Sequence, residues 1–155
     1  MQPTRRARSS TRSKREGSPA RSSARSWRAG RVSSASSEHG GTTMGTVVFI
    51  NSERIGTGDA DLGARLMGSF LYSLARTPIK PEALVFMNTG VRLTCEGSVA
   101  VEDLALLAAD GVAVYSCGTC LDWLGLRESL AVGVVGNMND SAAMLMAADD
   151  VVSVG

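Results

Sequence analysis

Short apolar runs alternate along the chain with longer stretches in which apolar residues recur at helical spacing. The runs at 46–51, 83–88 and 112–116 are rich in β-branched and other apolar residues, as in strands buried on both faces of a sheet. Between the first two runs, apolar residues recur every four positions from Leu62 to Leu74. This spacing predicts an amphipathic helix that Asp59 caps and that ends near residue 76.

Weaker patterns complete the prediction. We expect a loop or irregular strand at 88–98, a helix capped by Ser98 and closed by Gly111, a short helix within 121–130, a weak strand or loop at 132–135, a helix at 139–148 and a last strand at 150–154. Strands that alternate with helices imply right-handed crossovers. The predicted fold class is therefore α/β in three layers, with a mainly parallel sheet of about five strands and helices on both faces.

Polar and thiol side chains follow the predicted strands directly. Asn51 and Ser52 come after the first strand, Asn88 after the second and Cys117 after the third. Functional residues of such folds gather where parallel strands end at their carboxyl edge. We therefore expect these residues to lie along one edge of the sheet.

The charge distribution separates residues 1–43 from the rest of the chain. This segment is rich in Ser and holds ten basic and two acidic residues, whereas 44–155 hold six basic and thirteen acidic ones, so the net charges are +8 and −7. The segment has few apolar residues to bury, and we expect a disordered tail outside the fold. It could bind nucleic acid, act as a transit peptide, or be untranslated with Met44 as the natural start. We favour the last, so a role in nucleic-acid binding is not expected.

Cysteine usage indicates a reducing compartment. The chain has three cysteines, an odd number, and no hydrophobic region of a signal peptide is evident. Both observations disfavour a secreted protein held together by disulfides. A cytoplasmic location is therefore expected. No run of eighteen apolar residues predicts a membrane span.

The motif Cys117-Gly118-Thr119-Cys120 is the strongest chemical signal. A thiol at a strand end that opens a helix faces free backbone N–H groups and the positive end of the helix dipole, and both stabilise the reactive thiolate. We expect this environment for Cys117, and a more buried position with a weaker field for Cys120, one turn further along. Two buried small hydrophobic residues would be the alternative explanation of the motif.

Other chemistries fit the motif less well. A zinc site usually needs four ligands, but the chain has one cysteine pair, Cys95, and a single histidine in the tail, so no metal is expected. The absence of a histidine from 44–155 also disfavours a cysteine hydrolase. Thiol–disulfide exchange is a stronger competitor, although no proline follows Pro81 to sit against the pair. The glycines at 56 and 58 lack the third glycine of a dinucleotide loop, so they are interpreted as turn residues and no cofactor is predicted.

Several stretches resemble one family. They are GTGDADLG (56–63), NTGVRL (88–93), EGS (96–98), CGTCLDWLGL (117–126) and GNM (136–138). Together they resemble the DsrE-like domain of the YedF-type, sulfurtransferase-like selenium-metabolism proteins, over nearly all of 46–154. The resemblance implies a DsrE-like fold, a cysteine-bound persulfide or selenium adduct, and often oligomers. In related sulfur-relay proteins the sulfur-carrying cysteine occupies the strand end that Cys117 matches.

The chain also departs from that family. The N-terminal TusA-like domain of YedF-type proteins carries a Cys-Pro-x-Pro motif, and this motif is absent here. A separate TusA-like protein could therefore supply the donor.

These observations lead to one main hypothesis and two alternatives. The main hypothesis is a sulfur- or selenium-transfer protein in which Cys117 is the acceptor and Cys120 the resolving thiol. Cys95 could approach the same edge, and Asn88 and Asn137 are candidates to shape the pocket or simply turn residues. The alternatives are a binding or assembly subunit with structural cysteines, and a thiol–disulfide oxidoreductase. Sulfur or selenium donor and acceptor proteins, and a second copy of the chain, are the expected partners.

Overall fold

The computed structural model describes residues 44–155, so the predicted basic tail, 1–43, lies outside the described residues. Strands and helices alternate along this part of the chain. In chain order they are β1 (Met44–Ile50), α1 (Ala60–Arg76), β2 (Ala83–Phe86), the 3₁₀ helix η2 (Asn88–Thr94), α2 (Val101–Ala109), β3 (Ala113–Cys117), α3 (Gly118–Trp123), the 3₁₀ turn η3 (Arg127–Ser129), β4 (Val134–Gly136), α4 (Met138–Ala147) and β5 (Ala148–Val154).

The strands of residues 44–155 form one parallel sheet in the order β4-β3-β2-β1-β5. Ile50 pairs with Phe86 on one side and with Val154 on the other, so the carboxyl ends of three strands are level. The predicted α/β class with a parallel sheet of about five strands is confirmed. Several bounds differ, since β1 begins at Met44, β2 ends at Phe86, β3 includes Cys117 and β5 begins at Ala148. The short helix expected within 121–130 begins earlier, at Gly118, and ends at Trp123, and the weak strand expected at 132–135 lies at Val134–Gly136.

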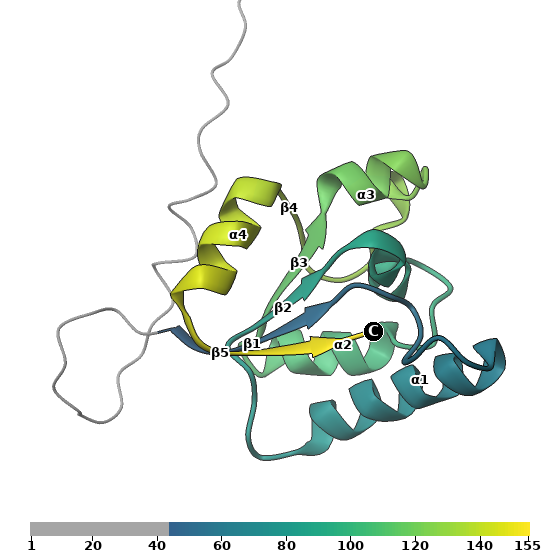
Figure 1. The fold of residues 1–155 in the computed structure, drawn as a ribbon, viewed down its shortest axis with the longest axis horizontal. Helices are drawn as coiled ribbons and strands as arrows, with labels where there is room; N and C mark the ends of the chain where they lie inside the picture. Colours follow the sequence, from purple (N-terminus) through teal and green to yellow (C-terminus); the bar gives the residue numbers. More distant parts are fainter. Residues whose placement is uncertain (1–43) are drawn as a thin grey trace, which may run out of the picture. The chain divides into compact units, whose positions relative to one another are not determined.

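The sheet is covered by helices on both faces (Figure 1). α1 and α2 pack on one face, where Met67, Leu71 and Leu104 lie in the main core with Ile50 and Phe86. α4 packs on the opposite face, where Met144 meets side chains of β1 and β2. The order of the strands explains this arrangement. From β1 to β3 the chain adds each new strand in one direction across the sheet, and then it returns from β4 to β5 in the opposite direction. Because crossovers between parallel strands are right-handed, reversing the direction places the connecting helix α4 on the other face.

Helix α1 begins as its sequence predicts. The Asp59 carboxylate accepts a hydrogen bond of 2.8 Å from the Leu62 N–H, and Asp59 is the N-cap. The predicted cap of α2 is wrong. Ser98 Oγ accepts from the Ala100 N–H in a preceding turn, and α2 begins only at Val101. Gly111 closes this helix with a φ of 92°, as predicted.

The segment after β2 differs from the expected loop or strand. It forms the 3₁₀ helix η2, and Cys95 then pairs with Leu130 in an isolated antiparallel bridge. Thr94 and Ser116, both fully buried, join η2 to β3 through a hydrogen bond of 2.8 Å between their hydroxyl oxygens. The segment therefore packs into the core beside the end of β3.

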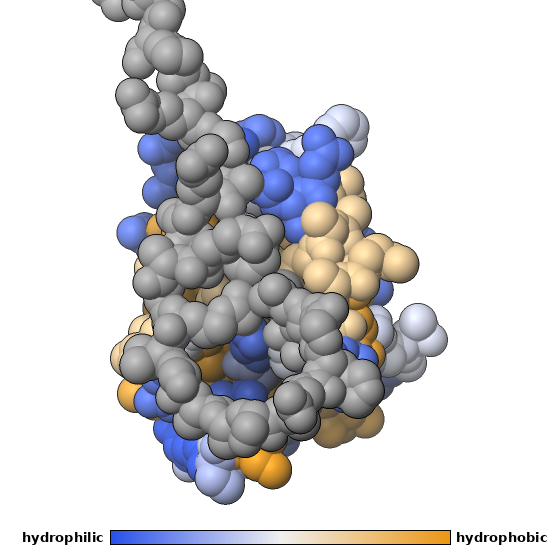
Figure 2. Space-filling model, turned by 90° about the vertical axis from the view of Figure 1, so that its left-hand side faces the viewer, coloured by the Kyte–Doolittle hydropathy of each residue, from blue (hydrophilic) through white to orange (hydrophobic). Residues whose placement is uncertain are grey.

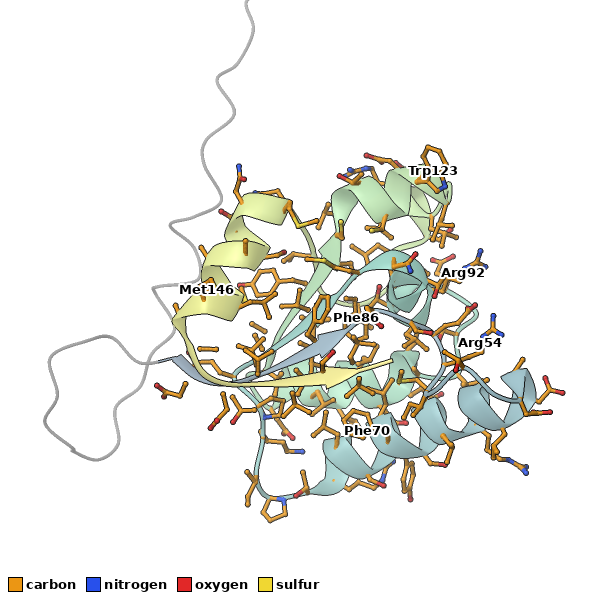
Figure 3. The ribbon with its side chains drawn as sticks, in the orientation of Figure 1. Arg54, Phe70, Phe86, Arg92, Trp123 and Met146 are labelled. Carbon is orange, nitrogen blue, oxygen red and sulfur yellow. The ribbon has the colours of Figure 1, made fainter. Side chains whose placement is uncertain are left out.

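The side of the molecule that carries α4 is turned toward the viewer in Figure 2, where hydrophobic and hydrophilic residues lie side by side. On α4 the Met146 side chain is 86% exposed (Figure 3). The edge strand β5 exposes Val151 and Val152.

No helix within 44–155 is long and apolar enough to cross a membrane.

Candidate functional site

The Cys117–Cys120 motif lies at the carboxyl edge of the sheet, where β3 passes directly into α3. Cys117 is the last residue of β3 and pairs with Gly136 of β4, so the sheet fixes its position. Leu121, fully buried, anchors the short helix in the core. The hydrophobic residues of β3 and α3 thus hold both cysteines at a strand end, as the sequence predicts.

The two thiols differ in accessibility, in the opposite sense to the prediction. Cys117 is buried, with 3% of its surface exposed, and belongs to the main core. Cys120, expected to be the more buried residue, is only partly buried. The reason is that β3 carries Cys117 into the sheet, whereas Cys120 lies on α3, where only Leu121 and Gly118 are buried.

The expected contact between the Cys117 thiol and the helix N-terminus is also absent. Cys117 is the N-cap residue of α3 by its backbone position, but its side chain makes no capping hydrogen bond. α3 is a helix of only six residues.

Asn88, the first residue of η2, joins the cysteine pair from beyond the end of the neighbouring strand β2. Its backbone N–H donates to Cys120 Sγ at 3.1 Å. Asn88 has a φ of 49°, the left-handed conformation that asparagine tolerates better than most residues, and it lies two residues after the last residue of β2. The structure therefore brings together Asn88, Cys117 and Cys120, although Asn88 contributes its backbone rather than its side chain.

Burial raises the pKa of the Cys120 thiol above its usual value, and its hydrogen bond with Cys117 raises it further. The Asn88 N–H acts in the opposite direction because it stabilises the negatively charged sulfur. The net effect favours the thiol over the thiolate at neutral pH. Cys120 is therefore a protonated thiol that already has a hydrogen-bond donor in place for its charged form.

An ion pair that sequence patterns did not indicate holds the start of α3. The Arg127 guanidinium donates to both carboxylate oxygens of Asp122, with Nη2 to Oδ2 at 2.7 Å, and also to the Gly118 carbonyl at 3.4 Å. Gly125, with a φ of 66°, turns the chain back so that these residues meet. The pair is missed in the sequence because a spacing of five residues does not place side chains together on one helix.

The hydrogen bonds of Cys95 do not involve Asn88, Cys117 or Cys120. Its thiol donates to the Val91 carbonyl at 3.2 Å, and only 3% of the residue is exposed. Burial raises the pKa of Cys95, while Thr94 and Arg92 oppose that shift. Its assignment to the functional site therefore stays a prediction, and its observed contacts are those of a core residue.

A cleft of about 610 Å³ opens beside Cys95. Its charged walls include Arg54 and Arg92, which lie near each other in Figure 3 and both form ion pairs with Glu53, at 3.5 and 3.8 Å. The sequence did not indicate this cleft, because its walls come from the loop after β1, from α1 and from the segment after η2.

Asn137 lies one strand further along the same edge, directly after Gly136, the partner of Cys117. Its side chain accepts from the Asp140 N–H at 2.9 Å and caps α4. This contact gives it a structural role, and a role in shaping the pocket stays a prediction. Within the described residues, no group of three His, Cys, Asp or Glu is placed to hold a metal ion.

The fold resembles those of several solved structures. The ychN protein from E. coli is 22% identical, with a TM-score of 0.50, and the match covers 72% of this chain and 99% of that one. The protein BT1422 from Bacteroides thetaiotaomicron, of unknown function, is 10% identical with a TM-score of 0.50, covering 70% and 94%. MTH1491 from Methanobacterium thermoautotrophicum, also of unknown function, is 19% identical with a TM-score of 0.47, covering 66% and 91%.

The domain has a DsrE-like fold. This confirms the fold that the motifs imply. At these identities the likeness extends to the fold alone, and the YedF-type subfamily stays a hypothesis. No family model and no curated protein matches the sequence.

Proposed function

We propose that the protein handles sulfur or selenium as a sulfurtransferase-like carrier, with a persulfide or a selenium adduct on the Cys117–Cys120 pair. The observation that carries the proposal is the constellation at Cys120, whose sulfur accepts a hydrogen bond of 3.1 Å from the Asn88 N–H and which lies three residues from Cys117, the N-cap residue of α3. Such a donor stabilises negative charge on sulfur, the charge that a thiol bears when it attacks or leaves.

The rest of the site supports this chemistry by holding the pair in place. Register pairing fixes Cys117 against Gly136, and Arg127 links Asp122, near the end of α3, with the Gly118 carbonyl at its start. The motif CGTCLD contributes Cys117, Cys120 and Asp122, and the loop NTGV contributes Asn88; both stretches resemble YedF-type sequences. The resemblance and the geometry thus point to the same two elements, α3 and η2.

The partners are proposals on the same basis. The pair needs a sulfur or selenium donor and an acceptor, and a TusA-like protein is our candidate donor because YedF-type proteins, which the sequence resembles, combine this domain with a TusA-like one. We also propose a homo-oligomer, which the exposed valines of the edge strand β5 favour. A cytoplasmic location would suit three free thiols.

The proposal is tested by exposing the purified full chain to inorganic polysulfide, or to selenide with a mild oxidant, and measuring its intact mass. The parent protein should gain sulfur or selenium, and the double variant Cys117→Ser/Cys120→Ser should gain none. Cys95→Ser is the matched control, because it removes a cysteine outside the constellation and should behave as the parent. An adduct that persists in the double variant would refute the proposal.

Thiol–disulfide exchange is the second candidate function, favoured by two free thiols that lie three residues apart at the start of α3. An oxidoreductase would pass electrons between the pair and a protein disulfide without holding a sulfur atom. Catalysed reduction of insulin by dithiothreitol, in a protein that gains no sulfur from polysulfide, would favour this candidate.

A further inference from the structure

The difference in accessibility between the two cysteines assigns them separate tasks. We propose that Cys120 is the thiol that receives sulfur from the donor and that Cys117 resolves the persulfide formed on it. This inference rests on the proposed function and reverses the order of the two thiols expected from the sequence.

Access to the sulfur atom is the first reason. A donor persulfide must bring its outer sulfur to the attacking thiolate in line with the bond that breaks. Cys117 has 3% of its surface exposed and packs among the core residues, so such an approach would require α3 to move. Cys120 is partly exposed, and Trp123, one turn further along α3, is 89% exposed (Figure 3). The outer side of α3 is therefore open at Cys120.

The hydrogen bond from Asn88 is the second reason. The N–H lies 3.1 Å from Cys120 Sγ, so it stabilises the Cys120 thiolate before attack. The same donor remains beside this sulfur after a persulfide has formed. Cys117 lies three residues before Cys120, at the N-cap of α3. Cys120 thus has both a charge-stabilising donor and a second thiol nearby.

The receiving step transfers one sulfur atom without net oxidation. The Cys120 thiolate attacks the outer sulfur of a donor persulfide, and a bond forms between Cys120 Sγ and that sulfur. The sulfur–sulfur bond of the donor breaks, and the donor leaves as a thiolate, which takes up the proton that Cys120 lost. The product is a persulfide on Cys120 and a free thiol on the donor.

The resolving step is a thiol–disulfide exchange within the pair. The Cys117 thiolate attacks Cys120 Sγ, and the bond from this atom to the outer sulfur breaks. Hydrosulfide leaves with the electron pair, so the outer sulfur is reduced while Cys117 and Cys120 are oxidised to a disulfide. A dithiol reductant then restores both thiols. Cys117 is the N-cap residue of α3 and Cys120 lies three residues further on, a spacing that places the two side chains near each other on one side of the helix.

Single-turnover mass spectrometry on the full chain tests this order, with inorganic polysulfide as the sulfur source and sulfide measured in the same samples. Cys117→Ser should keep an added sulfur atom on Cys120, because no thiol is left to resolve it. Cys120→Ser should lose the adduct and the sulfide release. The parent should first gain the sulfur atom and should then release sulfide and become two hydrogen atoms lighter, until dithiothreitol restores its mass. Cys95→Ser is the control and should match the parent.

The outcomes separate the inference from the proposed function. If Cys120→Ser keeps the adduct and Cys117→Ser does not, the inference is overturned and the proposed function stands. If neither the parent nor any variant gains sulfur, the proposed function itself fails. Because replacing the buried Cys117 could impair folding, limited alkylation of the parent is a second measurement. Peptide mapping should find Cys120 labelled before Cys117, and the reverse order would contradict the inference.

Discussion

Gly90 offers a sharp test of how the site is built, because it packs against the backbone at the end of β1. A Cβ atom at this position would lie 2.5 Å from the Ile50 carbonyl oxygen and 3.3 Å from the Ser52 nitrogen. Real Cβ contacts essentially never fall below 3.0 Å. Ile50 cannot yield easily, because its carbonyl accepts the Met87 N–H at 2.9 Å and its backbone pairs with both neighbouring strands. The substitution Gly90→Ala therefore forces η2 away from the sheet.

The size of the effect follows from the clash. Extra atoms in a packed interior cost about 1–3 kcal/mol. We expect the upper half of this range, about 2–3 kcal/mol, because the obstructing atoms belong to the backbone rather than to a flexible side chain. For a domain of this size, 1 kcal/mol corresponds to roughly 4 °C in Tm. Gly90→Ala should therefore lower the Tm by roughly 8–12 °C.

Gly68→Ala is the matched control, since it makes the same change where nothing lies within 4 Å of the added atom. Gly68 is inside α1, where alanine should stabilise the protein by about 0.5–1 kcal/mol. Thermal unfolding followed by circular dichroism, with urea titrations for the free energy, measures both. A Tm for Gly90→Ala equal to that of the parent would refute the reasoning, as would equal shifts for the two variants.

Three further predictions concern the thiol, an ion pair and the edge strand. Burial and Cys117 raise the pKa of Cys120, and only the Asn88 N–H opposes them. The alkylation rate of Cys120 should therefore still rise with pH above about 8.5, and a plateau of this rate below about pH 8.5 would contradict the raised pKa. Arg127 lowers the pKa of Asp122 in the folded protein. Their ion pair therefore stabilises the fold at pH values above the pKa that this carboxyl group has in the unfolded chain, and the contribution is lost as the pH falls through its lower pKa in the folded state. The Tm deficit of Asp122→Asn should therefore be small at neutral pH and vanish in acid, and a deficit unchanged at low pH would rule out the pair as its cause. Light scattering should show that the full chain self-associates and that Val152→Lys on β5 weakens the association. A strictly monomeric parent protein would disprove the predicted self-association.

The features that the sequence predicted well are those that depend on local patterns. The four-residue spacing from Leu62 to Leu74 predicts α1 as a helix and Asp59 begins it, because both act within a few residues of the chain. The buried face of the helix lies one position further along, at Met67, Leu71 and Ala75, whereas Leu62 and Leu66 are exposed. The apolar runs specify strands buried in a parallel sheet, and their alternation with helices specifies the crossovers. The position of Cys117 at a strand end follows from the same pattern.

Only the tertiary structure decided the contacts between segments that are distant in sequence. The hydrogen bond from Asn88 to Cys120 joins residues 32 apart, and its donor is a backbone N–H, which no side-chain pattern signals. The relative burial of Cys117 and Cys120 depends on how α3 leaves the sheet, which is set by Leu121, Gly125 and Arg127 together. The sequence by itself thus determined the fold class and the location of the cysteine pair, because local hydrophobic periodicity encodes both. The packing of α3 and η2 against β3 decided which thiol is accessible, because exposure is a property of the assembled core.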